Sequence, residues 1–124
     1  MEDKKKIFIV DDEDLIHETI TAGLAPDEFE IFDVYEGKGA VKLIEYIQPD
    51  LVILDIMMPT RDGRDICKEL KKNPITKDIK ILMLTARDEQ FERIVGLKLG
   101  ADDYETKPFS PTHLAIKIKK MCEI

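Results

Sequence analysis

IFIVDDED (residues 7–14) places four consecutive apolar residues directly before four acidic ones. An unbroken apolar run of this length is typical of a short strand buried on both faces of a sheet. The same pattern recurs in LVILD (residues 51–55), and a third apolar run covers residues 79–84 with only Lys80 interrupting it. These runs predict three central strands, two of which lead into carboxylates.

Helical segments separate the apolar runs. Within each segment, apolar residues recur mostly three or four positions apart, which places them on one face of a helix. The predicted buried faces are Ile16, Ile20 and Leu24; Ala40, Leu43, Ile44 and Ile47; Ile66 and Leu70; Phe91, Ile94 and Val95; and Leu114, Ile118 and Met121. Asn73-Pro74 and Gly100 predict helix ends, and Ser110-Pro111 predicts the start of the last helix.

Two weaker segments complete the pattern. Residues 29–34 alternate only in part, because Glu30 breaks the apolar run, and residues 102–106 form a short last strand. Strands that alternate with helices need crossover connections, so they form a parallel sheet with helices on both faces. We therefore predict an α/β fold of flavodoxin-like type, a doubly wound five-stranded parallel sheet or (βα)5. Placing the weaker strands at the edges gives the strand order 2-1-3-4-5.

The composition agrees with one globular domain. The chain has 124 residues and a mass of 14.3 kDa, and 44% of it is hydrophobic, so we assign residues 1–124 to one domain. A formal charge of -7 and a pI near 4.9 argue against direct nucleic-acid binding, which needs a basic face. No apolar run approaches the ~20 residues of a membrane span, and the first residues are too weakly apolar for a signal peptide. The two cysteines form no metal-binding pattern, and we expect reduced thiols and a cytoplasmic location.

Polar side chains follow four of the predicted strands. Asp11 and Asp12 follow the first strand, Asp55 the third, Thr85 the fourth and Lys107 the fifth. Taken singly, each has an ordinary structural explanation, as a helix-capping acid, a turn residue, a strand-end hydroxyl or a solvated lysine. Ligands of doubly wound sheets, however, bind outside the carboxyl ends of the strands, where all five residues would meet. The sequence therefore predicts a site at this edge of the sheet.

Three carboxylates in one place repel one another. At an effective dielectric constant near 20, two such charges ~4–5 Å apart cost about 3–4 kcal/mol. Lys107 cannot neutralise three acids, so either one acid takes a proton or a divalent cation binds. Because only oxygen donors are present, we expect Mg²⁺, with Mn²⁺ as a substitute. Mg²⁺ commonly binds together with phosphate, and a carboxylate between a metal and an ammonium group can attack phosphorus to give an aspartyl phosphate.

Four motifs resemble those of the receiver domain of two-component response regulators. They are IFIVDDED (7–14), PDLVILDIMMPTRDG (49–63), ILMLTA (81–86) and LGADDYETKPFSP (99–111), in this order and over nearly the whole chain. Four motifs at the right separations are more specific than any one of them. The resemblance, which is to the chemotaxis-regulator-like receivers, implies a signalling domain rather than an enzyme with a substrate of its own. It also implies that a sensor histidine kinase phosphorylates one aspartate.

The resemblance assigns roles by position. Asp55 matches the phosphoacceptor, and Thr85 and Lys107 match the two residues that contact the phosphoryl group. Tyr104 matches an aromatic switch residue that turns inward when the threonine hydroxyl moves toward the phosphate. The Lys107-Pro108 bond resembles the family's cis peptide. The implied Mg²⁺ ligands are Asp11, Asp12, Asp55 and the backbone carbonyl of Met57.

The implied output surface is formed by the fourth helix, the fifth strand and the fifth helix, and it would control a downstream protein or a fused output domain. FERIVGLKLGADDY (residues 91–104) resembles receivers that dimerise through this surface by alternating charges. We therefore expect a monomer or a phosphorylation-dependent dimer. The charged residues that suit this dimer are Arg93, Asp102, Asp103 and Lys117. Outside the motifs, we expect His17 to be a partly exposed helix residue and His113 a surface residue.

Three other functions fit parts of the pattern. A haloacid-dehalogenase-type phosphatase would use the same Asp, Thr and Lys, but it needs a second acid two residues after the nucleophile, where this chain has Met57. A flavodoxin-like FMN binder needs a phosphate-binding loop rich in Ser, Thr or Gly, and DDED (residues 11–14) occupies that place. An unphosphorylated receiver-like interaction module would lack an acid, the threonine or the lysine, and none is missing.

Overall fold

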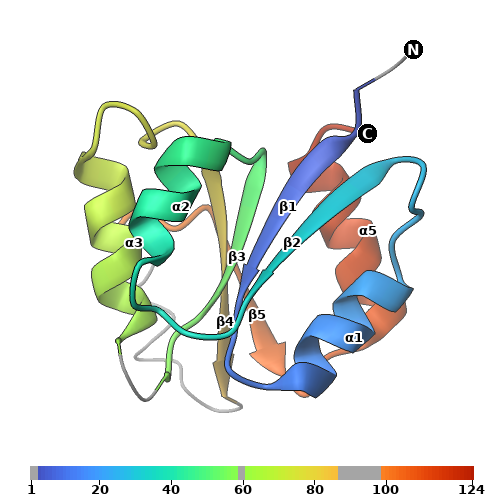
Figure 1. Ribbon diagram of the computed structural model, residues 1–124. Coiled ribbons are helices and arrows are strands. Elements are labelled where there is room, and N and C mark those ends of the chain that lie inside the picture. Colours follow the sequence, from blue (N-terminus) through green and yellow to red (C-terminus); the bar gives the residue numbers. More distant parts are fainter. Residues whose placement is uncertain (1–2, 59–60, 87–98) are drawn as a thin grey trace.

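The computed structural model describes residues 3–58, 61–86 and 99–124. Strands and helices alternate from β1 to β4 as predicted, and α5 follows β5 (Figure 1). The elements are β1 Lys5–Val10, α1 Asp14–Ala22, β2 Phe29–Val34, α2 Ala40–Ile47, β3 Leu51–Asp55, α3 Gly63–Lys72, β4 Lys80–Ala86, β5 Asp103–Lys107 and α5 Pro111–Met121. The helix expected around residues 91–95, including Arg93, lies outside the described residues.

The five strands form one parallel sheet in the order β2-β1-β3-β4-β5, which confirms the predicted topology. In Figure 1, α2 and α3 cover one face of the sheet, and α1 and α5 cover the other. Because all strands run in one direction, their carboxyl ends lie together at the lower edge of that view, where the arrowheads of β4 and β5 point. This edge contains every strand-end residue that the sequence analysis selected.

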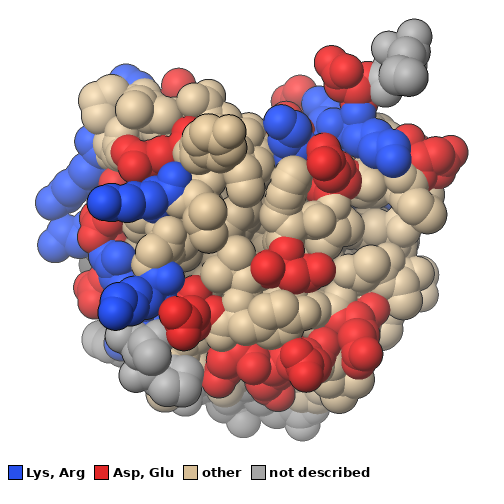
Figure 2. All heavy atoms as spheres, in the orientation of Figure 1, with Lys and Arg blue, Asp and Glu red and all other residues tan. Residues whose placement is uncertain are grey.

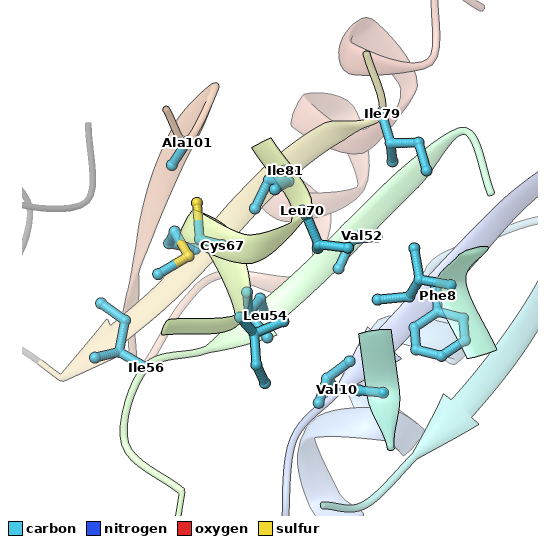
Figure 3. Packing of buried hydrophobic residues seen from close by; sticks show 14 of the residues in the cluster. Phe8, Val10, Val52, Leu54, Ile56, Cys67, Leu70, Ile79, Ile81 and Ala101 are labelled. Atoms are coloured by element: carbon cyan, nitrogen blue, oxygen red, sulfur yellow. The ribbon is translucent and has the colours of Figure 1, made fainter. Parts of the chain in front are cut away.

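The core has two layers because side chains alternate along the buried strands. Phe8 and Val10 pack with Val52 and Leu54 on the side of α2 and α3, as Figure 3 shows. Ile7 and Ile9 pack on the opposite side, against residues of α1 and α5. All of these side chains are fully buried. The central strands are therefore held on both faces, and the loops at their carboxyl ends extend from a rigid base.

Local capping explains where two helices begin. Ser110 accepts a hydrogen bond from the His113 backbone N–H and is followed by Pro111, as the sequence predicts for the last helix. Asp62 caps α3 in the same way by accepting from the backbone N–H of Arg64.

Among the described residues, no helix combines the length and the apolar character needed to cross a membrane.

Three details of the sequence reading are wrong. Leu43 was expected on the buried face of α2, but it is 45% exposed, because α2 packs on the core through Ala40 and Ile44, with Val41 and Ile47 partly buried beside them. His17 was expected to be partly exposed, but it is buried. Thr85 was expected after the fourth strand, but β4 continues to Ala86, so Thr85 lies inside the strand and pairs with Thr106 of β5.

Candidate functional site

Three aspartates meet at the carboxyl edge of the sheet. Val10 of β1 lies opposite Leu54 of β3, so the acids that follow these residues emerge side by side. Carboxylate oxygens of Asp11, Asp12 and Asp55 lie within 4.8 Å of one another. Asp11 and Asp55 are buried, whereas Asp12 is exposed. The predicted acidic cluster therefore exists, and it opens to solvent on the Asp12 side.

Backbone N–H groups orient the two buried carboxylates. Asp11 Oδ1 accepts a hydrogen bond of 2.9 Å from the backbone N–H of Glu13. Asp55 Oδ1 accepts a weaker bond of 3.3 Å from the backbone N–H of Met57. Each acid is thus held by the turn that follows it, and the Met57 side chain itself is largely exposed. The local backbone therefore helps to fix the direction of both carboxylates.

Lys107 is the cation of the cluster. Its Nζ lies 2.9 Å from Asp11 Oδ2, 3.2 Å from Glu13 Oε1 and 3.5 Å from Asp55 Oδ1. The Lys107-Pro108 peptide bond is cis. Glu13 was not selected from the sequence, because an exposed acid at the start of a helix has an ordinary explanation there. Among the described residues, one ammonium group thus serves three carboxylates, which leaves an excess of negative charge.

The charges of the cluster shift two pKa values. Burial, followed by the charge of Asp11, raises the pKa of Asp55 from 3.8 to about 6, although Lys107 and the Met57 N–H act in the opposite direction. Burial by itself would lower the pKa of Lys107, but its contacts with Asp11, Asp55 and Glu13 outweigh that effect and leave the pKa raised. The ammonium group therefore stays charged, while Asp55 is the acid most easily protonated in the absence of another cation.

The hydroxyl of Thr85 is buried and unused. Among the residues that the structure describes, Thr85 Oγ1 has no hydrogen-bond partner, and the residue is only 2% exposed. Because a buried hydroxyl without a partner is costly, such an atom needs an explanation. Thr85 pairs with Thr106 in the sheet, next to Ala86 and Lys107. A free donor is thus available one position before the strand end, close to the backbone of the lysine.

Tyr104 lies inside the protein. It is 2% exposed and belongs to the core cluster on the α2 and α3 side, together with Cys67 and Ala101. In β5 it pairs with Met83, two residues before Thr85. The aromatic residue expected to turn inward on activation is therefore already in the inward position in this structure.

The residues expected at a charged dimer surface make contacts within the chain. Asp102 Oδ2 accepts hydrogen bonds from the backbone N–H of Ile81 (2.8 Å) and from Lys71 Nζ (3.2 Å). Lys117 donates to the carbonyl oxygen of Tyr104 (2.8 Å), and its Nζ lies 3.6 Å from Asp103. These charges stabilise the ends of β5 from within the chain. His113, as expected, lies at the surface.

Gly63 positions Asp55 and was not recognised from the sequence. The backbone N–H of Gly63 donates a 2.9 Å hydrogen bond to the carbonyl oxygen of Ile56. A Cβ atom at Gly63 would lie 2.1 Å from the backbone oxygen of Asp55, far inside contact distance. The first turn of α3 can therefore pack against the end of β3 only because this residue has no side chain.

The donor set fits a hard divalent cation. The three aspartates offer only oxygen ligands, Lys107 is the described cation that offsets a part of their charge, and Asp12 leaves an open side for water. Figure 2 shows acidic side chains gathered along the lower edge of the view, on the side where the strands end in Figure 1. The oxygen donors of this cluster therefore suit a hard divalent cation better than a softer metal that prefers nitrogen or sulfur.

The raised pKa of Asp55 predicts a pH-dependent stability of the metal-free protein. A carboxyl group whose pKa is higher in the folded state loses its contribution to stability as the pH rises from about 4 to about 6. Over this range, Asp55→Asn should therefore gain up to about 3 kcal/mol in unfolding free energy relative to the wild type. Urea unfolding of both proteins in EDTA at several pH values measures the difference. If the difference in unfolding free energy between the two proteins does not change with pH, the pKa of Asp55 is not raised in the folded state.

The close packing of Gly63 predicts a cost for a single methyl group. Gly63→Ala should lower the unfolding free energy by about 1–3 kcal/mol, because the end of β3 has to shift. Gly23→Ala is the matched control, since its Cβ would meet nothing closer than 3.5 Å. Urea unfolding compares the two variants. Equal stability of the two would show that the loop adapts without cost.

Comparisons with known proteins agree with this geometry. The family model for the response regulator receiver domain matches residues 7–119. A putative response regulator from Chloroflexus aurantiacus is 34% identical, with a TM-score of 0.90, over 98% of this chain and 100% of that chain. The receiver domain of a signal transduction histidine kinase from Syntrophus aciditrophicus is 31% identical, with a TM-score of 0.85, over 96% and 90%. The chemotaxis protein CheY4 of Vibrio cholerae is 25% identical, with a TM-score of 0.86, over 96% and 99%. The chain therefore belongs to the response regulator receiver domain family.

Proposed function

We propose that this receiver domain accepts a phosphoryl group on Asp55 in a Mg²⁺-dependent reaction. The observation that supports this most strongly is the convergence of three aspartates and Lys107 at one edge of the sheet, with Asp55 buried among them. The donor is a phosphohistidine of a sensor histidine kinase or a small acyl phosphate. The three-dimensional match to other receivers supports this choice over a phosphatase.

The reaction follows from the positions of these groups. A carboxylate oxygen of Asp55 forms a bond to phosphorus, and the bond from phosphorus to the imidazole nitrogen of the kinase breaks. The leaving imidazole takes a proton from solvent. Asp11, Asp12, Asp55 and the carbonyl of Met57 would hold Mg²⁺, which supplies charge neutralisation for the phosphoryl oxygens. Hydrolysis of the acyl phosphate by water later restores Asp55.

Lys107 and Thr85 would read the new phosphoryl group. Lys107 already lies 3.5 Å from Asp55 and would exchange its carboxylate contacts for a phosphoryl oxygen. The hydroxyl of Thr85 has no hydrogen-bond partner among the described residues and would donate to another phosphoryl oxygen. Movement of Thr85 would act on β4 and, through the core position of Tyr104, on β5.

Partner control is proposed at the surface that contains β5 and α5. A downstream protein or a fused output domain would bind there, and the protein would act as a monomer or as a phosphorylation-dependent dimer. We propose that residues 1–124 form a single receiver domain. The expected cytoplasmic location stays a prediction.

Phosphorylation should depend on one carboxylate. Incubation with acetyl phosphate and Mg²⁺ should add the mass of one phosphoryl group, because Asp55 is the buried acid next to Lys107. Asp55→Asn should abolish the added mass, whereas Asp27→Asn, which replaces an exposed acid in the loop between α1 and β2, should not. Intact-protein mass spectrometry gives the result. If the wild type stays unmodified even with a cognate kinase and ATP, the proposal is wrong. The function that then remains is that of an unphosphorylated interaction module.

Loss of the Thr85 hydroxyl should separate phosphorylation from output. Thr85→Ala should still be phosphorylated, because the hydroxyl makes no contact with Asp55 before the reaction. Phosphorylation of this variant should change partner affinity less than in the wild type, since the link to β4 is missing. Affinity is measured with and without the phosphoryl group by titration calorimetry. An unchanged response would show that the switch does not act through Thr85.

A further inference from the structure

His17 is a buried residue of α1 that has no role in the phosphoryl transfer proposed above. It is 2% exposed, and its Nε2 lies 2.7 Å from the backbone carbonyl oxygen of Asp11. A peptide carbonyl can only accept, so Nε2 has to carry the hydrogen in this contact. The ring of His17 therefore donates a hydrogen bond to the residue that begins the acidic cluster.

Two further contacts hold the ring of His17 in this orientation. Its Nδ1 lies 2.6 Å from Oδ1 of Asp33, which is in β2. The ring also stacks on Tyr35, with 4.0 Å between centroids and 29° between planes. The histidine therefore cannot rotate without losing both its polar and its stacking contacts. It ties α1 to the end of β2 and, through Nε2, to the end of β1.

The contact acts on the peptide plane that joins Asp11 to Asp12. The backbone N–H of Asp11 donates a 3.1 Å hydrogen bond to the carbonyl oxygen of Val34. The carbonyl oxygen of Asp11 accepts a hydrogen bond from His17. Its carboxylate is held by the N–H of Glu13. The carbonyl belongs to the peptide that leads into Asp12, so its direction sets the backbone from which the exposed acid extends.

We propose that His17 is a positioning residue of the cation site. Its Nε2 hydrogen bond fixes the Asp11-Asp12 peptide, so that both carboxylates face the same point as Asp55. Outer-shell hydrogen bonds of this kind typically change metal affinity by about 10- to 100-fold when they are removed. The inference rests on the proposed Mg²⁺ site, and it adds a residue that lies outside the acidic cluster and outside the motifs of the sequence.

Two substitutions of His17 by amide residues distinguish the role of Nε2 from that of Nδ1. His17→Gln places an amide N–H near the position of Nε2 and can keep the bond to Asp11. His17→Asn places its amide near the position of Nδ1 and loses that bond, although it can still reach Asp33. His113→Asn is the matched control, because it removes an exposed histidine of α5. Isothermal titration with MgCl₂ gives the Kd, circular dichroism confirms folding, and the amide shift of Asp12 in metal-free protein reports the peptide plane.

The expected result is a Kd for Mg²⁺ raised about tenfold in His17→Asn. The Kd should stay within about threefold of the wild type in His17→Gln and in the control, and only His17→Asn should move the Asp12 amide signal in metal-free protein. Equal affinity of all variants would overturn the proposal. An equal loss in His17→Asn and His17→Gln would also overturn it, because it would show that the ring matters only for packing. Absence of Mg²⁺ binding in the wild type would instead contradict the proposed function itself, and the role of His17 with it.

Discussion

The structure depends on the crowding of like charges at one edge of a parallel sheet. Asp11 and Asp55 are buried next to each other because β1 and β3 are neighbours that run in the same direction. Burial, and after it the repulsion between these two acids, raises the pKa of Asp55 to about 6. Lys107 relieves only a part of this repulsion, since it serves three acids at once. The core therefore stabilises an arrangement that the site by itself would not adopt, and a divalent cation and a phosphoryl group are the natural complement.

Rigid surroundings turn these charges into a defined site. The central strands are covered on both faces, so their ends have little freedom to move apart under repulsion. Gly63 lets α3 approach the backbone of Asp55, and the turns after β1 and β3 orient the carboxylates through backbone N–H groups. His17 adds a contact from the α1 side. Phosphorylation would act on the few groups that these contacts leave free, above all the hydroxyl of Thr85.

The sequence predicted the topology because the three apolar runs are distinct from the two weaker strands, and topology alone brought Asp11, Asp55 and Lys107 to one edge. It did not predict Gly63, Glu13 or His17. The role of Gly63 depends on an approach of two backbones, which leaves no pattern in the sequence. His17 and Asp33 are 16 residues apart, and they meet only through the pairing of β1 with β2. Contacts of this kind follow from packing rather than from periodicity.

The fold forces Asp55 into an electrostatic environment that a bound cation relieves. Carbon-13 NMR of the Asp55 carboxyl group across a pH titration, with and without Mg²⁺, measures this directly. The account predicts a pKa of about 6 without metal, well above the ordinary 3.8, and a clear decrease when Mg²⁺ is added. An ordinary pKa that Mg²⁺ does not change would show that the acids neither repel one another nor share a cation.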